Sequence, residues 1–232
     1  MNTRTMEPFG DDARRARLLP LIDHTLLTPE ATPRQVEAHL REAVELGLSA
    51  VCLRPHLIPE DALGLRIVTV CGFPSGAHDA VVKALEAERA LARGADDIDM
   101  VVDLGAVKAH DWGAVRDDIR TVRAVVPAGK VLKVIIEAAV LTDDEVVACC
   151  RIGEELGVDY MKTSTGYHPA GGANLADVAL MSRVLGDRVG VKASGGIRTL
   201  AQAAAMVDAG AARLGVSGTR ALLVGASADS RY

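Results

Sequence analysis

Short apolar runs alternate with longer amphipathic segments along the chain, from about residue 21 to residue 226. Each apolar run has the length of one buried strand, and each amphipathic segment has the length and period of a helix with one apolar side. The predicted strands are LIDHTLL, AVCLRP, RIVTVCGF, DIDMVVD, VLKVIIEA, VDYMKTS, VGVKASG and RLGVSG. About eight strand–helix units in succession are typical of a closed (β/α)8 barrel, the α/β fold known as the TIM barrel.

The residues that flank the amphipathic segments support this division. Thr32, followed by Pro33 and Gln35, predicts the start of a helix, and Thr142 with Glu145 predicts a capping box. Glycines at the far ends predict where helices stop; they are Gly47, Gly94, Gly157, Gly186 and Gly210.

An open, doubly wound sheet is the competing architecture. That fold commonly has a glycine-rich turn after its first strand, whereas this chain continues through HTLLTPEATP. No linker rich in proline, serine or charge divides the chain. We therefore expect a single barrel domain over residues 18–228, preceded by a short N-terminal extension (1–17) that is partly helical and followed by a polar tail (229–232).

Composition agrees with buried parallel strands covered by helices. Hydrophobic residues make up 49% of the 232 residues but aromatic residues only 3%, so the core must consist mainly of Ala, Val, Leu and Ile. The net charge of -5 is spread along the chain, and we expect no nucleic-acid partner.

Neither cysteine spacing nor hydropathy indicates secretion or a membrane. Cys52, Cys71, Cys149 and Cys150 form no CxxC motif, which favours free thiols in a reducing compartment. No apolar segment approaches the length of a membrane span. The sequence predicts a soluble, cytoplasmic protein with no membrane partner.

Charged residues interrupt several of the predicted strands. Three successive strands each carry one lysine, namely Lys133, Lys162 and Lys192. Asp23, Asp99 and Glu137 lie in or just after the first, fourth and fifth strands, and alternation places Lys133 and Glu137 on one face. Because side chains at the carboxyl ends of barrel strands converge on one mouth, we expect these groups to meet.

Crowded ammonium groups lower one another's pKa. Two such charges about 6 Å apart repel by roughly 3 kcal/mol at an effective dielectric near 20, which corresponds to about two pKa units. Burial acts in the same direction, and a neutral amine can attack a carbonyl group to form a Schiff base. The simpler interpretation is that the lysines form ion pairs with Asp99 and Glu137 and do no chemistry. Three lysines with carboxylates at one mouth favour a reactive site.

Two glycine-rich turns suggest an anion site. KASGGIRTLAQ places Gly195 and Gly196 directly after the seventh strand, and GVSGTRAL repeats the arrangement with Gly218 after the eighth. Backbone N–H groups of such turns can hold a phosphate, with Arg198 and Ser217 close by. Glycines after strands are also ordinary turn residues.

Taken together, IDHTLLTPEAT, AVCLRP, DIDMVVDLGAVK, LKVIIEA, YMKTSTG and VKASGGIRT resemble the deoxyribose-phosphate aldolases, class I aldolases built on a (β/α)8 barrel. The likeness runs in order from about residue 21 to residue 220. It implies reversible cleavage of 2-deoxy-D-ribose 5-phosphate to acetaldehyde and D-glyceraldehyde 3-phosphate, with no metal or other cofactor. It also implies a homodimer or homotetramer.

The resemblance carries residue roles with it. Lys162 in MKTSTG would form the Schiff base, and Lys192 in VKASGG would lower its pKa. Asp99 would act as general acid and base through water, with Lys133 holding it in place. Members of the family can use a mobile C-terminal tyrosine in enamine proton exchange, which here would be Tyr232.

The remaining candidates are residues that would contact the substrate. Cys52 occupies a position where the family often has a cysteine that lines the substrate channel, although packing is its more natural role. Asp23, Thr163 and Gly218 complete the set of predicted substrate- or phosphate-binding residues.

Two other functions compete. A metal-dependent sugar-phosphate aldolase or epimerase would need clustered histidines and carboxylates, but the six histidines show no HxH or HxxxH pairing. A non-catalytic sugar-phosphate-binding barrel would have no use for an amine with a lowered pKa.

Overall fold

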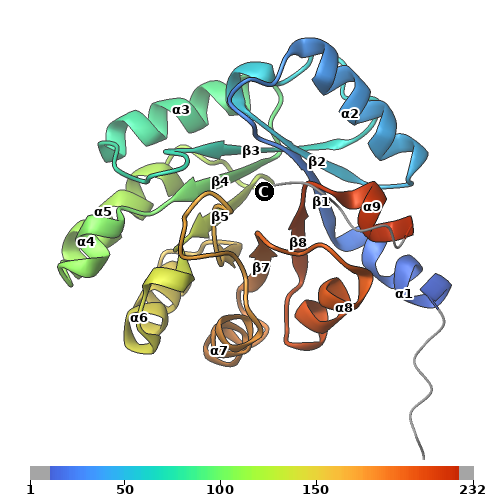
Figure 1. The fold of residues 1–232 in the computed structure, drawn as a ribbon. Coiled ribbons are helices and arrows are strands. Elements are labelled where there is room, and N and C mark those ends of the chain that lie inside the picture. Colours follow the sequence, from blue (N-terminus) through green and yellow to red (C-terminus); the bar gives the residue numbers. More distant parts are fainter. Residues whose placement is uncertain (1–10, 225–232) are drawn as a thin grey trace, which may run out of the picture.

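The computed structural model describes residues 11–224, in which eight parallel strands close into a barrel in the order β1-β2-β3-β4-β5-β6-β7-β8 (Figure 1). The strands are β1 (Ile22–Leu26), β2 (Ala50–Leu53), β3 (Arg66–Cys71), β4 (Asp97–Val101), β5 (Val131–Ile135), β6 (Tyr160–Lys162), β7 (Gly190–Ser194) and β8 (Arg213–Val216).

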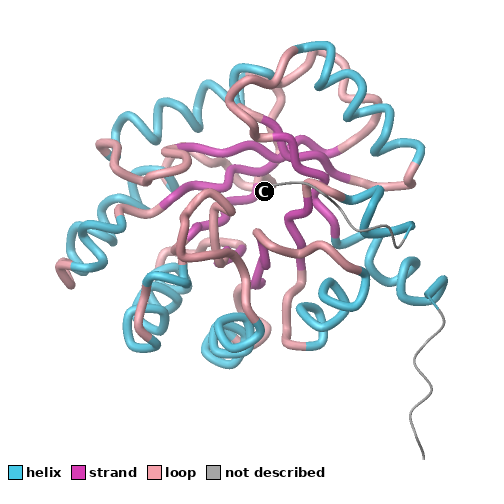
Figure 2. Tube along the Cα trace, in the orientation of Figure 1, coloured by secondary structure: helices cyan, strands magenta, loops and turns pink. Residues whose placement is uncertain are grey.

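The α-helices form a layer outside the ring of strands (Figure 2). They are α1 (Asp11–Leu18), α2 (Pro33–Glu45), α3 (Ala80–Ala92), α4 (Leu104–Lys108), α5 (Trp112–Arg123), α6 (Asp143–Glu155), α7 (Leu175–Leu185), α8 (Leu200–Asp208) and α9 (Thr219–Val224). In the same described stretch, three single 3-10 turns lie among them: η1 (Leu19–Leu21), η2 (Pro55–Leu57) and η3 (Ala138–Val140).

Closure of the barrel confirms the predicted (β/α)8 fold. Each of the eight predicted apolar runs contains one of the observed strands. The first strand pairs with the last, with His24 of β1 opposite Val216 of β8, so that no strand in the described part of the chain is left at an edge. This pairing rules out the open sheet that the sequence left as an alternative.

The helix ends follow the predicted signals. Thr32 forms a capping box with Gln35 at the start of α2, and Thr142 forms one with Glu145 at the start of α6. Gly47 after α2 has a φ of 70°, a left-handed conformation in which glycine has no Cβ penalty.

The apolar core lies mainly between strands and helices. Alternation along each strand sends one set of side chains outward, such as Ile98 and Met100 of β4, which are fully buried against the helices. Inside the barrel the apolar part is smaller and is concentrated on β2 and β3, where Cys52, Val68 and Val70 pack together. The rest of the barrel interior is available for charged groups.

The predicted N-terminal extension is helical where the structure describes it. Helix α1 covers Asp11–Leu18, and Leu18 is buried. Arg15 donates from Nε to the carbonyl oxygen of Leu223 over 2.7 Å, and Arg17 pairs with Asp208 over 2.9 Å. These contacts attach α1 to the C-terminal part of the barrel. Residues 1–10 and 225–232 lie outside the described part of the chain, and with them the predicted barrel limit at 228 and the polar tail.

Within residues 11–224, no helix combines the length and apolar character that a membrane crossing requires.

Candidate active site

Asp99, on β4, lies at the centre of a cluster of three lysines inside the barrel. Its Oδ1 accepts a hydrogen bond from Lys133 Nζ over 2.9 Å, and its Oδ2 accepts from both Lys162 Nζ (2.8 Å) and Lys192 Nζ (2.7 Å). Asp99, Lys133 and Lys192 are wholly buried, and Lys162 is 3% exposed. The structure therefore brings together the four groups that the sequence singled out.

Strand register explains how residues far apart in the chain meet. Asp99 lies opposite Lys133 across β4 and β5, and Lys162 lies opposite Lys192 across β6 and β7. All four occupy strand positions whose neighbours in sequence face the helices, so that the four side chains point into the barrel.

Two further carboxylates complete the charged interior. Asp23 Oδ2 accepts from Lys192 over 2.5 Å, and Asp97 Oδ2 accepts from Lys133 over 2.5 Å. Asp97 also pairs through Oδ1 with Arg66 Nε over 2.5 Å. Each buried ammonium group thus has at least one carboxylate partner, as buried charges require.

The pKa values of the two neighbouring lysines shift in opposite directions. The pKa of Lys162 is lowered, first by burial and then by the positive charge of Lys192, against the opposing effect of Asp99. For Lys192 burial also disfavours the charge, but Asp23 and Asp99 outweigh it and raise its pKa. Lys162 is thus the amine that loses its proton more easily, while Lys192 stays charged beside it.

Burial, and not the neighbouring ammonium, is the larger cause of the shift at Lys162. From the sequence alone, repulsion between the lysines is the expected main cause. Lys162 is almost wholly buried, so the loss of solvation is large, and Asp99, bonded to both amines, opposes the effect of Lys192 on the pKa of Lys162.

The carboxylate of Asp99 is held ionised. Although burial opposes the charge, Lys133, Lys162 and Lys192 together lower its pKa well below the ordinary value. Lys192, Lys133 and Arg213 lower the pKa of Asp23 in the same way. Both carboxylates therefore act as acceptors in the resting site.

Glu137 does not pair with a lysine, contrary to the ion-pair interpretation of the sequence. It has a left-handed backbone (φ 51°) two residues after the end of β5, and its carboxylate accepts from the Thr165 hydroxyl over 2.6 Å. The second carboxylate partner of Lys133 is Asp97, and not Glu137 as the sequence suggested.

A cavity of about 170 Å³ opens above the lysine cluster. Lys162 lines it, together with Ser194, Gly195 and Gly196 at the end of β7 and Ser217 after β8. An adjoining pocket shares both glycines and includes Arg198. The reactive amine and the predicted phosphate turn therefore border one continuous space.

Other predicted contact residues do not line that cavity. Thr163 is buried, and its hydroxyl oxygen accepts from the Ser194 backbone N–H over 3.1 Å. Cys52 lies in the apolar half of the interior, where burial raises the pKa of its thiol to about 11. Asp23 is bonded to Lys192, and Gly218 precedes α9 without reaching either pocket. Tyr232 lies outside the described residues.

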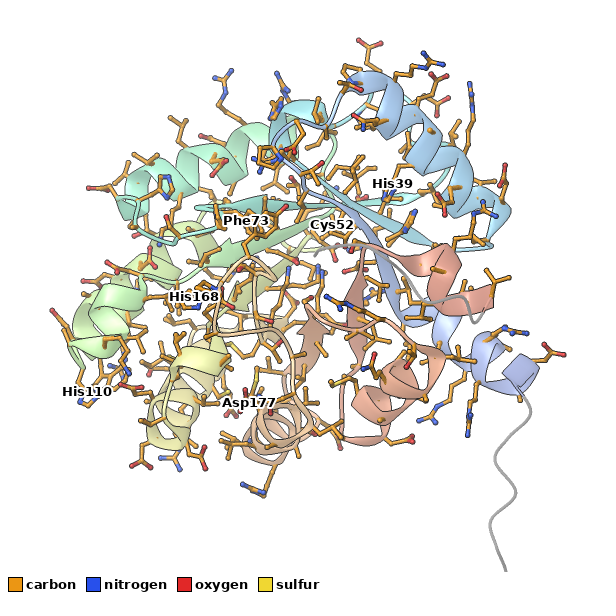
Figure 3. The ribbon with its side chains drawn as sticks, in the orientation of Figure 1. His39, Cys52, Phe73, His110, His168 and Asp177 are labelled. Atoms are coloured by element: carbon orange, nitrogen blue, oxygen red, sulfur yellow. The ribbon has the colours of Figure 1, made fainter. Side chains whose placement is uncertain are left out.

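Two of the histidines lie together, since the rings of His24 and His39 stack with centroids 3.6 Å apart. His110 lies away from this pair, at the periphery of the molecule (Figure 3). Across residues 11–224 no three His, Cys, Asp or Glu side chains are grouped so that they could hold a metal ion. The barrel interior offers ammonium groups where a metal site would need ligands.

Sequence reasoning missed Asp97, Ser194 and Tyr167. Asp97 and Ser194 lie two positions before Asp99 and two after Lys192, so the period of two along a strand was a usable signal for both. Tyr167 borders both pockets and meets Phe73 edge-on, with ring centroids 5.2 Å apart. Tyr167 lies in the loop after β6. Loops have no periodic pattern from which the direction of a side chain could be predicted.

A closed barrel with a buried amine beside a carboxylate at its mouth is the arrangement of barrel enzymes that attack carbonyl groups through lysine. The comparisons specify this class further. Residues 17–224 match the family model described as DeoC/LacD family aldolase, and the chain belongs to that family.

Named relatives cover nearly the whole chain. A deoxyribose-phosphate aldolase of Kocuria rhizophila is 55% identical over 212 residues, which are 91% of this chain and 97% of the relative. One of Mycobacterium tuberculosis is 55% identical over 219 residues, covering 92% and 97%. Among solved structures, the aldolase QR15 has a TM-score of 0.84 at 33% identity, covering 92% of this chain and 95% of its own. The tetrameric deoxyribose phosphate aldolase of Aeropyrum pernix has a TM-score of 0.80 at 30% identity, covering 94% and 98%.

Proposed function

We propose that this chain is a class I aldolase that cleaves 2-deoxy-D-ribose 5-phosphate reversibly to acetaldehyde and D-glyceraldehyde 3-phosphate. The observation that carries the proposal is Lys162, a buried amine with a lowered pKa that lines the cavity and lies 2.8 Å from Asp99. The names of the relatives supply the substrate.

The reaction begins when neutral Lys162 attacks C1 of the open-chain sugar. The carbinolamine loses water to give a protonated imine, which withdraws electrons from the C2–C3 bond. Removal of the C3 hydroxyl proton then breaks that bond, releases glyceraldehyde 3-phosphate and leaves an enamine on Lys162. Protonation of the enamine at C2 and hydrolysis of the imine release acetaldehyde and restore the amine.

Asp99 is the group that we assign to proton transfer. Because its carboxylate is ionised at rest, it enters as a base and becomes an acid only after it has accepted a proton. It lies beneath the cavity, bonded to Lys162, so a water molecule must carry protons between Asp99 and the C3 oxygen.

Lys192 and Lys133 support this assignment in different ways. Lys192 stays charged and holds the pKa of Lys162 down, in addition to the effect of burial. Lys133 bridges Asp97 and Asp99 and keeps the Asp99 carboxylate in place. Neither lysine lines the cavity, so both act through their neighbours.

The phosphate would bind at the turn after β7. Gly195 and Gly196 have φ values of 85° and 77° and border both pockets, and Arg198 adds a positive charge at the outer one. Backbone N–H groups of such a turn suit a phosphate. Ser217 faces the same space from the end of β8.

Borohydride trapping tests the proposal. The protein is incubated with acetaldehyde or deoxyribose phosphate and reduced, and the adduct is located by peptide mass. An adduct on Lys162, together with aldehyde release by the untreated enzyme, is the expected result. Lys162→Ala should abolish both, whereas Lys108→Ala, which removes a half-exposed lysine outside the barrel, should change neither. An active enzyme with no adduct, or an adduct only at another lysine, would overturn the assignment.

We also propose the domain limits, the cellular location, the oligomeric state and a role for Tyr232. We assign the barrel domain to residues 18–228, expect the protein to act in the cytoplasm, and expect a homodimer or homotetramer, by analogy with the tetramer named for the Aeropyrum pernix relative. For Tyr232 the proposed role in enamine proton exchange is testable with Tyr232→Phe, which should slow exchange of acetaldehyde methyl protons with solvent.

A further inference from the structure

Ser194, at the end of β7, has a buried hydroxyl group without a partner. The residue is 5% exposed, and its Oγ is the one buried side-chain hydroxyl in residues 11–224 that makes no hydrogen bond. Leaving such a group unpaired costs free energy, so it calls for an explanation.

The residue that carries this hydroxyl lines the cavity that holds the reactive amine. Ser194 and Lys162 both line it. Ser194 lies two residues after Lys192 on the same strand, so its side chain faces the barrel interior as that of Lys192 does. The neighbouring strand leaves room for it, because a Cβ at Gly215 would lie only 2.3 Å from Ser194 Oγ.

Neighbouring residues hold the Ser194 backbone firmly. Its N–H donates to Thr163 Oγ1 over 3.1 Å, and its carbonyl oxygen accepts from the Ala173 N–H over 2.9 Å and from the Ser164 hydroxyl. The hydroxyl is therefore carried on a well-anchored strand end. Such rigid placement is what a specific contact with a ligand requires.

Two other hydroxyls of the cavity lining are already used. Thr165 donates to Glu137 over 2.6 Å, and Thr25 donates to the carbonyl oxygen of Asp23 over 2.9 Å. Ser194 differs from these two because its donor and acceptor capacity remains free for a ligand.

From these observations we infer that Ser194 Oγ binds the C4 hydroxyl of the sugar phosphate and sets the preference for acceptor aldehydes that carry it. The inference rests on the proposed function. Along β7, from the barrel interior towards the mouth, Lys192 comes first, then Ser194, and then the Gly195–Gly196 turn. A strand rises about 3.3 Å per residue. The open-chain substrate has its carbonyl carbon, its hydroxyls and its phosphate in the same order.

The choice of C4 over C3 follows from the chemistry. The C3 oxygen must lose its proton towards Asp99, in the lysine layer, and becomes the carbonyl oxygen of the leaving aldehyde. The C4 hydroxyl lies one carbon nearer the phosphate and takes no part in bond breaking. Ser194, between the lysines and the glycine turn, lies at the level of that outer hydroxyl.

The synthetic direction tests this contact. Acetaldehyde is added to D-glyceraldehyde 3-phosphate or to 3-oxopropyl phosphate, which lacks the hydroxyl that becomes the one at C4. Ser194→Ala should lower kcat/KM for glyceraldehyde 3-phosphate about 10-fold, because one hydrogen bond is lost, and leave kcat/KM for 3-oxopropyl phosphate within about twofold of the wild type. Equal losses with both acceptors, or no loss with either, would overturn the inference.

Two controls separate the possible failures. Ser182, on α7, packs its hydroxyl against Gly210 in the helix layer, where a Cβ on that glycine would lie 2.2 Å from it, so Ser182→Ala should alter neither acceptor. Borohydride trapping of acetaldehyde on Lys162 should be the same in Ser194→Ala and in the wild type, since acetaldehyde carries no hydroxyl. A wild-type protein that traps nothing and releases no aldehyde refutes the proposed function, and the inference with it. A wild type that traps and cleaves, with unchanged discrimination in Ser194→Ala, refutes the inference alone.

Discussion

Lys162 and Lys192 donate hydrogen bonds to one and the same oxygen, Oδ2 of Asp99, over 2.8 and 2.7 Å. The distance between the two Nζ atoms is therefore at most the sum of these two hydrogen-bond lengths. Asp23 gives Lys192 a second carboxylate at 2.5 Å, whereas Lys162 has none besides Asp99 within residues 11–224. This inequality decides which amine stays charged and which one can become a nucleophile.

Replacing Lys192 by methionine should remove the neighbouring positive charge while filling similar space. The pKa of Lys162 then rises, and a smaller fraction of it is neutral at pH 7. We expect kcat/KM to fall by about 100-fold or more and the pH profile of borohydride trapping on Lys162 to move to higher pH. Trapping rates measured across a pH series check the shift. An unchanged profile in Lys192→Met would contradict the electrostatic role of this lysine.

Asp99→Asn should weaken the fold as well as the activity, because three buried ammonium groups lose the carboxylate that they share. Breaking a buried ion pair on one side costs about 3–5 kcal/mol. Urea unfolding should show a loss of this size. The matched control is Glu37→Gln on α2, which breaks the exposed pair with Arg41 and should cost less than about 0.5 kcal/mol. Similar losses in the two variants would argue against a special role for the buried cluster.

A second buried ion pair, outside the barrel interior, should be purely structural. Lys83 of α3 donates to Asp118 of α5 over 2.8 Å and to the carbonyl oxygen of Val101 over 2.9 Å, and it is fully buried. Lys83→Met leaves the Asp118 charge without its partner and should cost about 3 kcal/mol of unfolding free energy. Adding Asp118→Asn removes that charge and keeps an acceptor for the Asp103 N–H, so the double variant should regain most of the loss.

Steady-state kinetics of these variants test whether the Lys83–Asp118 pair has any role in activity. Because Lys83 touches neither pocket, kcat and KM for deoxyribose phosphate should stay near wild-type values below the unfolding temperature. A double variant as unstable as Lys83→Met would show that packing, and not the unpaired charge, causes the loss.

His24 should make the fold sensitive to mild acid. Burial first, then His39 and Arg220, lower its pKa to about 3, and its ring stacks on His39 with centroids 3.6 Å apart. In the unfolded chain the imidazole takes up a proton near pH 6.5, but in the fold it does so only near pH 3. Stability is therefore complete above pH 6.5 and is lost as the pH falls towards 3. The loss from this group between pH 7.5 and pH 5 should be about 2 kcal/mol.

Urea unfolding of His24→Phe at the two pH values checks this prediction. Phenylalanine keeps a ring against His39 but cannot be protonated, so the difference in stability between pH 7.5 and pH 5 should shrink. His78→Asn, at an exposed position, should retain the wild-type difference. Equal pH dependence in His24→Phe and the wild type would rule out His24 as the source.

Local pattern alone determined much of this protein. The eight apolar runs, the capping boxes at Thr32 and Thr142 and the lysines set within the strands all depend on residues near in sequence, and period and capping chemistry act over that range. The same pattern placed Lys162 and Lys192 on neighbouring strands, where barrel closure brings them together.

Only the tertiary structure decided which side chains pair with one another and whether burial or neighbouring charge shifts the pKa of Lys162 most. Asp23 meets Lys192 across 169 positions of sequence, which only closure of β8 onto β1 brings about. Glu137 adopts a left-handed conformation after its strand and bonds to Thr165, and Asp97 joins the cluster in its place. The Ser194 side-chain hydroxyl is left without a hydrogen bond. Sequence period says which face a side chain takes, but hydrogen bonds and desolvation depend on distances across the barrel, which no local pattern contains.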